Sequence, residues 1–260
     1  MKIRISAILL LSLLGCHIYK HSEEETIKIP ASPYQKIQVK TINGRIEIEG
    51  TSDTLVTVKV KRLIYGGSQK EAESHIKDIK VRVIRDRERG ILKIEAYPPK
   101  IFIRVYSASF HITLPCSISS YLKTSNGRII VKGMKAPTET HTLNGGIEIH
   151  NHSGSIISKT SNGKIVAEVN LPPKGICRLQ TSNGGIMLSI PDTISARIEA
   201  ETDNGRIEMR DLDISVEEVR GTYLKGRMGK GEGEIYLKTS NGNIILRAIS
   251  QSTSPSPASL

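Results

Sequence analysis

Apolar and polar residues alternate along most of this chain, and the alternation restarts after each copy of a repeated Asn-Gly pair. The residue two before the asparagine is always Thr, the residue three after it is always Ile, and the residue five after it is always apolar. The seven pairs are Asn43-Gly44, Asn126-Gly127, Asn144-Gly145, Asn162-Gly163, Asn183-Gly184, Asn204-Gly205 and Asn241-Gly242. Because successive side chains of a strand point to opposite faces, both apolar positions lie on one face. Each copy therefore predicts a strand that starts after Asn-Gly and buries one face.

Two folds compete to explain this repeat. Asn-Gly between alternating segments is a strong hairpin signal, since both residues tolerate positive φ. In a series of hairpins, however, equivalent residues lie two strands apart, whereas in a solenoid they stack about 4.8 Å apart. Stacking is what favours identical Thr, Asn and Ile at each copy. We therefore predict an all-β fold, a β-solenoid with rungs of 18 to 21 residues that turn at Thr-x-Asn-Gly. The final gap of 37 residues predicts two rungs, one without the turn.

One helix interrupts the strands. Ser68 and Glu71 have the spacing of a capping box, and apolar residues follow at helical intervals, which predicts a short inserted helix over residues 68–78. Alternation resumes over residues 80–84 and 90–96. The solenoid domain is expected over residues 27–249, and the low-complexity tail 250–260 is expected to be disordered.

The N-terminus has the pattern of an export signal. Lys2 and Arg4 precede an apolar run that is too short to span a bilayer, which indicates a signal peptide over residues 1–15. Leu13-Leu14-Gly15-Cys16 resembles a bacterial lipoprotein box, so Cys16 is the expected lipidation site, carrying acyl chains such as palmitate. Residues 16–26 would then be the lipid-bearing cysteine and a polar tether. The alternative is an ordinary secretory peptide in which Cys16 has no role.

This interpretation predicts that the protein lies in the cell envelope and is attached to a membrane through its lipid. The outer membrane or cell surface is expected, and the periplasmic face is the alternative. Removal of residues 1–15 lowers the net charge of the chain from +11 to +9, which suits an anionic glycan, anionic lipid or acidic envelope protein. Aromatic residues make up only 4% of the chain, which argues against nucleic acid as a partner.

Basic residues recur on both sides of the corner. The positions three before and two after the asparagine carry the candidate polyanion-binding residues Lys40, Arg45, Lys123, Arg128, Lys159, Lys164, Arg206 and Lys238. In a solenoid they would form rows of stacked positive charge that a polyanion would stabilise. The alternative is that these charges only prevent sheets from aggregating.

Other patterns give weaker signals. Glu201 and Asp203 share a strand face, but catalysis on a glycan would need clustered carboxylates. His141, His150 and His152 are expected to be solvated, and the segment 226–234 to be a flexible crossing, so no metal, cofactor or catalytic residue is predicted.

Cys116 and Cys177 are expected about three rungs apart, beyond the reach of a disulfide. The apolar outer positions Ile130, Val166, Met187 and Ile245 suggest a face covered by the inserted helix or by a partner.

The order of these features resembles a known family. An early "TINGRIEI", a "GSQKEAESHIKDIKVRV" helix and strand, an "ITLP" strand, the Thr-x-Asn-Gly rungs and a terminal "GRMGKGEGEIYLKTSNGNIIL" are similar to the bacterial putative-adhesin family of β-strand-repeat proteins. The resemblance covers residues 27–249 and implies an exported β-solenoid without catalytic residues. The expected function is a non-catalytic adhesion or scaffold module, and the alternative is a carbohydrate-active enzyme.

Overall fold

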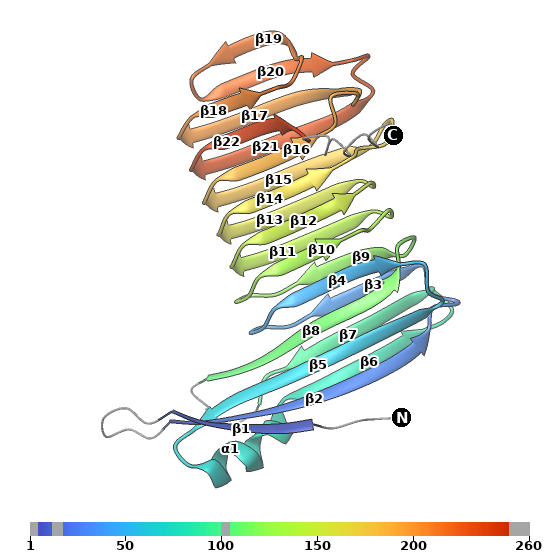
Figure 1. Ribbon diagram of the computed structural model, residues 1–260, viewed down its shortest axis with the longest axis vertical. Helices are drawn as coiled ribbons and strands as arrows, with labels where there is room; N and C mark the ends of the chain where they lie inside the picture. Colours follow the sequence, from blue (N-terminus) through green and yellow to red (C-terminus); the bar gives the residue numbers. More distant parts are fainter. Residues whose placement is uncertain (1–4, 12–17, 100–104, 250–260) are drawn as a thin grey trace, which may run out of the picture.

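Two long β-sheets face each other along the whole stack in a computed structural model, which describes residues 5–11, 18–99 and 105–249 (Figure 1). We call them sheet A and sheet B. Each contains eleven strands in the described residues. In spatial order, sheet A is formed by β1 (Ile5–Leu11), β2 (Ile18–Pro30), β5 (Leu55–Gly66), β8 (Val105–Pro115), β4 (Ile46–Thr51), β10 (Ile129–Lys132), β12 (Ile147–His152), β14 (Ile165–Val169), β16 (Ile186–Ile190), β22 (Ile244–Ala248) and β18 (Ile207–Arg210). Sheet B is formed by β19 (Ser215–Arg220), β20 (Tyr223–Met228), β17 (Ala196–Asn204), β21 (Gly233–Asn241), β15 (Ile176–Asn183), β13 (Ile156–Asn162), β11 (Thr138–Asn144), β9 (Ser119–Lys123), β3 (Lys36–Lys40), β7 (Ile91–Tyr97) and β6 (Lys80–Asp86).

The repeated unit is a rung of two strands. Each Asn-Gly pair joins a strand of sheet B to the next strand of sheet A, and equivalent strands of neighbouring rungs pair in parallel. The register places like on like: Ile129 pairs with both Ile46 and Ile147. The β-solenoid prediction is therefore confirmed, and the hairpin alternative is wrong for the repeated rungs.

The order of the rungs differs from the order of the sequence at the C-terminal end. The strands β21 and β22, the last in the chain, lie between β15–β16 and β17–β18. The 37-residue gap is therefore not two rungs with one lost turn. Instead, β19 and β20 form an antiparallel hairpin that pairs with β17 and closes the end of sheet B, and the chain then returns to fill the space that it had passed.

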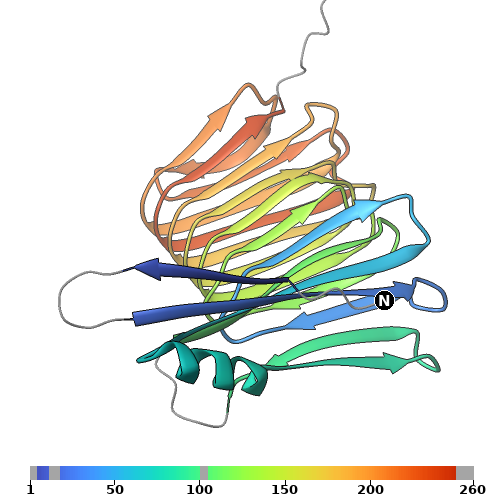
Figure 2. The same ribbon diagram turned by 60° about the horizontal axis from the view of Figure 1, so that its bottom comes forward.

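The 83-residue gap between the first two Asn-Gly pairs builds the other end of the stack. The first rung, β3 and β4, pairs directly with β9 and β10, so the intervening residues lie to the N-terminal side of it. The predicted helix is confirmed as α1 (Gln69–His75), followed by a 3-10 turn. The Ser68 hydroxyl accepts a hydrogen bond from the Glu71 amide (3.2 Å), while the Glu71 carboxylate accepts one from the Gly67 amide (2.8 Å). Figure 2 shows α1 at the N-terminal end of the stack.

The prediction of a polar tether over residues 16–26 is wrong for residues 18–26, which form part of a strand. Residues 18–26 belong to β2, which pairs antiparallel with β5 along its whole length after Ile18. His21 and Glu25 of this polar stretch are buried, so these side chains are shielded from solvent. Residues 5–11, within the expected signal peptide, pair with β2 as β1. Cys16 and the tail 250–260 lie outside the described residues.

The core between the sheets is a set of aliphatic columns. The isoleucine three after the asparagine is at most 1% exposed in six rungs, and Ile207, in the last rung of the stack, is half-buried. Cys177 continues a column between Ile156 and Ile235, and burial raises the pKa of its thiol to about 12. Cys116 and Cys177 are both free thiols. Burial of such columns supplies the main stabilisation of a solenoid. Because each rung contacts only its neighbours, this stabilisation acts between adjacent rungs.

Candidate functional site

The Thr-x-Asn-Gly corner forms a continuous hydrogen-bonded column. Each asparagine except Asn43, which only accepts in the column, donates from Nδ2 to Oδ1 of the asparagine on the neighbouring rung, at 2.8 Å for five of the six links and 3.0 Å for the sixth. In spatial order the column is Asn43, Asn126, Asn144, Asn162, Asn183, Asn241 and Asn204. Because each amide offers one donor and one acceptor to the column, every inner member has both partners.

The threonine and glycine of the corner have matching roles. Each threonine hydroxyl in the six rungs beyond the first donates to the carbonyl of a corner glycine on the adjacent rung, as Thr160 does to Gly145 (2.9 Å). The glycine is required because the rungs approach closely. A Cβ on Gly163 would lie 2.1 Å from the Gly145 carbonyl oxygen. The corner is thus a structural device, and its polar atoms are used within the stack.

The row three before the asparagine lies on the outer face of sheet B. In spatial order it reads Lys40, Lys123, His141, Lys159, Gln180, Lys238 and Glu201. The sequence suggested stacked positive charge along this row. The structure shows instead that positive charges do not occupy every rung. Beyond Lys40, a lysine occupies every second rung, and His141 and Gln180 occupy the rungs between.

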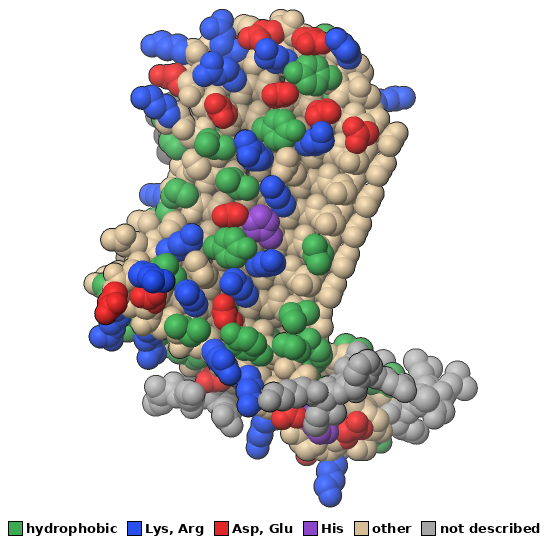
Figure 3. Space-filling view, turned by 180° about the vertical axis from the view of Figure 1, so that it is seen from behind, with side chains coloured by type: hydrophobic (Ala, Val, Ile, Leu, Met, Phe, Trp, Pro, Cys, Tyr) green, Lys and Arg blue, Asp and Glu red, His purple; other side chains and the backbone are tan. Residues whose placement is uncertain are grey.

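A shallow groove of about 520 Å³ runs along this row. Lys123, Lys159 and Lys238 line it together with His141 and Gln180. The other lining residues are Tyr121, Thr124, Thr142, Leu143, Thr160, Ser161, Thr181, Ser182 and Ser240. No acidic residue is among the described residues that line it. Figure 3 shows one outer face of the stack, where basic side chains and a smaller number of acidic ones follow its length beside a column without charged side chains. We call the groove lined by Lys123, Lys159 and Lys238 the sheet B groove.

Carboxylates close the row at both ends. Lys238 Nζ lies 3.0 Å from Glu201 Oε2, and this hydrogen bond raises the pKa of the Lys238 ammonium. Lys40 lies 3.5 Å from Glu95, whose pKa is lowered by a hydrogen bond from the Tyr97 hydroxyl and by the charge of Lys40. Within the described part of the chain, no carboxylate lies within ion-pair distance of Lys123 or Lys159. The positive potential of the groove is therefore centred on these two lysines.

The second predicted row does not form a comparable site. On the sheet A side of the corner its spatial order is Arg45, Arg128, Gly146, Lys164, Gly185, Asn243 and Arg206, so glycine and asparagine interrupt it. Arg45 pairs with Glu47 (2.7 Å) and Arg128 with Glu148 (3.1 Å). Burial alone would raise the pKa of Glu47, but a hydrogen bond from Lys132 and the charges of Lys132, Arg45 and His111 hold it below its ordinary value. These arginines are already neutralised by the protein.

The other candidate catalytic and metal-binding residues do not come together in one site. Glu201 and Asp203 share the outer face of β17, with Glu201 engaged by Lys238. His141 Nε2 lies 2.6 Å from Glu139. The described residues contain no group of three or more His, Cys, Asp or Glu that could hold a metal ion.

Two expectations need correction here. His152 is fully buried, not solvated, because a register shift after Ile149 turns it inward; its Nε2 lies 3.2 Å from the Ser155 carbonyl oxygen, and burial lowers its pKa. Residues 226–234 are not a flexible crossing: they end β20, form a tight turn and begin β21.

The profile of the Toastrack family DUF4097 matches residues 11–247. The chain belongs to this family. Three solved structures illustrate the similarity: a putative cell adhesion protein from Clostridium sporogenes (16% identity, 88% of this chain and 100% of the other, TM-score 0.49), a putative adhesin from Bacteroides fragilis (9%, 86% and 96%, 0.32), and a putative lipid binding protein from Parabacteroides distasonis (13%, 87% and 97%, 0.27). No curated protein matches the sequence.

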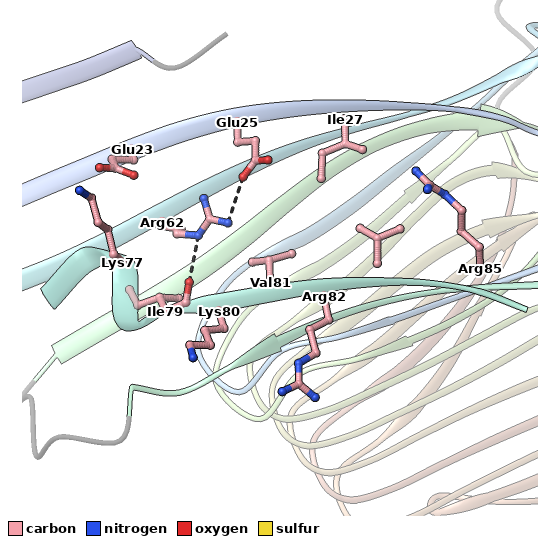
Figure 4. Close-up of a pocket in the computed structure, with 11 residues that line it drawn as sticks. Glu23, Glu25, Ile27, Arg62, Lys77, Ile79, Lys80, Val81, Arg82 and Arg85 are labelled. Carbon is pink, nitrogen blue, oxygen red and sulfur yellow. Dashed lines mark hydrogen bonds and ion pairs between the residues drawn. The ribbon is translucent and has the colours of Figure 1, made fainter. Parts of the chain in front are cut away.

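A second cavity of this Toastrack chain lies at its N-terminal end. It measures about 510 Å³ and opens between β2 of sheet A and β6 of sheet B (Figure 4). Arg62 spans its base, donating from Nη2 to Glu25 (3.1 Å) and from Nε to the Ile79 carbonyl (3.0 Å). Both charged side chains are largely buried, at 13% and 7% exposure. Exposed lysines and arginines surround the mouth, but the base is occupied by this ion pair.

Of the apolar positions predicted on the outer face of sheet A, Ile130 is buried, at 3% exposure. Val166, Met187 and Ile245 are consecutive in the sheet and half-buried. Helix α1 packs instead against β2 and β5 at the end of the stack, through a cluster that includes Ile64, Ile76 and Ala108. The helix is therefore excluded as the cover of this row, and a partner stays a prediction. In the described parts of the chain, no helix is long and apolar enough to cross a membrane.

Proposed function

We propose that this Toastrack protein is a non-catalytic binding module of the bacterial cell envelope that holds an anionic polymer in the sheet B groove. The observation that carries the proposal is a groove that no acidic residue lines, where Lys123 and Lys159 have no carboxylate within ion-pair distance among the described residues. Lys238, which is paired with Glu201, lies beside them in the same groove. A groove of one sign of charge attracts and retains a polyanion, and its affinity falls as salt screens the interaction.

A lipid on Cys16 would keep the module at a membrane surface, with the stack projecting away from it. Multiple acyl chains on one cysteine give stable anchoring where one chain does not. Attachment of a cell to material that carries the polymer would be adhesion, which is also the activity named in the descriptions of two similar structures. Retention of an envelope polymer would instead be scaffolding.

A carbohydrate-active enzyme is the weaker assignment. Glycoside cleavage commonly needs two carboxylates placed on either side of the scissile bond. Glu201 is held by Lys238 at the end of the groove, and its neighbour Asp203 lies two residues on along the same strand. We therefore assign Glu201 to charge balance at the groove.

Binding of the full chain to two soluble acidic glycans, hyaluronan and polygalacturonate, measured by calorimetry across a range of salt concentrations, tests this function. The triple variant Lys123→Gln, Lys159→Gln, Lys238→Gln should lose most of the affinity. The matched control replaces Lys28, Lys59 and Lys70, three exposed lysines outside the groove, with Gln. Equal affinity of the two triple variants, or no binding by the native chain at low salt, would refute the proposal.

A further inference from the structure

The spacing of charge in the sheet B groove carries information about its ligand. Pairing of β9, β11, β13, β15 and β21 places Lys123, Lys159 and Lys238 on alternate strands of one sheet. Neighbouring strands lie about 4.8 Å apart, so successive lysines are about 10 Å apart along the groove.

The rungs between the lysines present His141 and Gln180 in the same row. His141 is held by Glu139 at 2.6 Å, and its ring lies 5.6 Å from that of Tyr121. Gln180 presents an amide, which both donates and accepts hydrogen bonds. Ser161, Ser182 and Ser240 add hydroxyls along the wall, while Tyr121 and Leu143 provide apolar surface at one end.

We infer that the ligand of the groove is a linear glycan in extended form with one acidic group on every second sugar. An acid on alternate sugars repeats at an interval close to that of the lysines, and the intervening neutral sugar would lie against His141 or Gln180. This inference rests on the proposed function and adds the charge period of the polymer to it. A carboxylate and a sulfate ester both fit the lysine, which binds as a point charge.

A polymer with an acid on every sugar fits less well. Half of its charges would lie opposite His141 and Gln180, where the described part of the groove presents no lysine, and the Glu139 carboxylate lies beside His141. Desolvating these unpaired charges costs affinity. The groove therefore discriminates between polymers by the period of their charge rather than by its total.

Lysine exchange along the row tests the inference directly. The full chain is titrated with hyaluronan, which has one carboxylate per two sugars, with polygalacturonate, which has one per sugar, and with neutral dextran, all of similar length. The native chain should prefer hyaluronan per bound segment. Gln180→Lys adds a charge on an intervening rung and should raise the affinity for polygalacturonate about fivefold while leaving that for hyaluronan nearly unchanged. Gln38→Lys adds the same charge on sheet B outside the groove and serves as its control.

Two further outcomes separate the inference from the proposed function. Equal affinity for both polyanions, with equal effects of Gln180→Lys and Gln38→Lys, would overturn the charge period and leave polyanion binding intact. Absence of binding to either polyanion would overturn both. Tighter binding of an added sulfated glycan of the same charge period than of hyaluronan would support the inference and identify the acid. Because Gln180 is only half-buried, we expect Gln180→Lys to fold. Circular dichroism of each variant checks this.

Discussion

Asn241 Nδ2 donates a hydrogen bond of 2.8 Å to Asn183 Oδ1, although 58 residues separate the two in the chain. On its other side Asn241 accepts a hydrogen bond from Asn204 at 3.0 Å. The last rung of the sequence is therefore an inner rung of the stack. This insertion also brings Lys238 into line with Lys159, since β21 lies directly beside β15.

Replacing Asn241 with Ala should lower the free energy of unfolding by about 2 kcal/mol, because two links of the column are lost. The terminal member Asn43 has one link in the column, to Asn126, so Asn43→Ala should cost about half as much. Urea denaturation of both variants gives the comparison. Equal losses would mean that the links do not contribute separately.

Replacing Gly163 with Ala should destabilise the protein by about 3 kcal/mol or more, since the new Cβ would meet the backbone carbonyl of Gly145 at 2.1 Å. The control is Gly221→Ala, because no atom lies within 4 Å of the corresponding Cβ. Its effect should stay within about 0.5 kcal/mol. Thermal and urea unfolding measure both, and a tolerated Gly163→Ala would contradict the close approach of the rungs.

Replacing Arg62 with Ala should cost about 3 kcal/mol, because it breaks a largely buried ion pair with Glu25 and removes the donor to the Ile79 carbonyl. The neighbouring pair of Lys61 and Glu24 is exposed, and Lys61→Ala should cost less than about 1 kcal/mol. Denaturant titration at neutral pH distinguishes the two. Similar losses would show that the Arg62 pair is solvated.

Glu47 should make the stability pH-dependent on the acid side. Its pKa is lower in the folded protein than the ordinary value of 4.5, so its stabilisation is fully present above that value and is lost as pH falls through the lowered pKa. Glu47→Gln should therefore be less stable than the native chain at pH 7, with the difference shrinking as the pH falls below 4.5. A difference that is constant over this range would exclude the ionised carboxylate as its cause.

Replacing Cys16 with Ala should release the protein from membranes if the cysteine carries the lipid. Fractionation of cells that produce the native chain or the variant measures this, and protease treatment of intact cells locates the native chain. Cleavage on whole cells supports adhesion, whereas protection until the envelope is opened supports scaffolding. An unchanged membrane fraction for Cys16→Ala would contradict the lipid anchor.

Much of the fold follows from local pattern in the sequence. The invariant Thr, Asn and Ile of each copy predicted parallel stacking, because only vertical neighbours benefit from identical residues, and the Ser68 cap predicted α1. Burial of His152 escaped prediction because a register shift after Ile149 reverses the alternation. Pairing of residues 18–26 with β5 escaped it because that stretch is polar, and its partner strand lies far along the chain.

The sequence by itself therefore determined the rung, its corner and its inward face, since these depend on period and on contacts between repeats. Only the tertiary structure decided the order of the rungs. In sequence order Glu201 would follow Gln180, but β21 takes that place and brings Lys238 with it. Strand order depends on which edge the returning chain pairs with, which is a long-range choice that the repeat, being the same at every edge, does not encode.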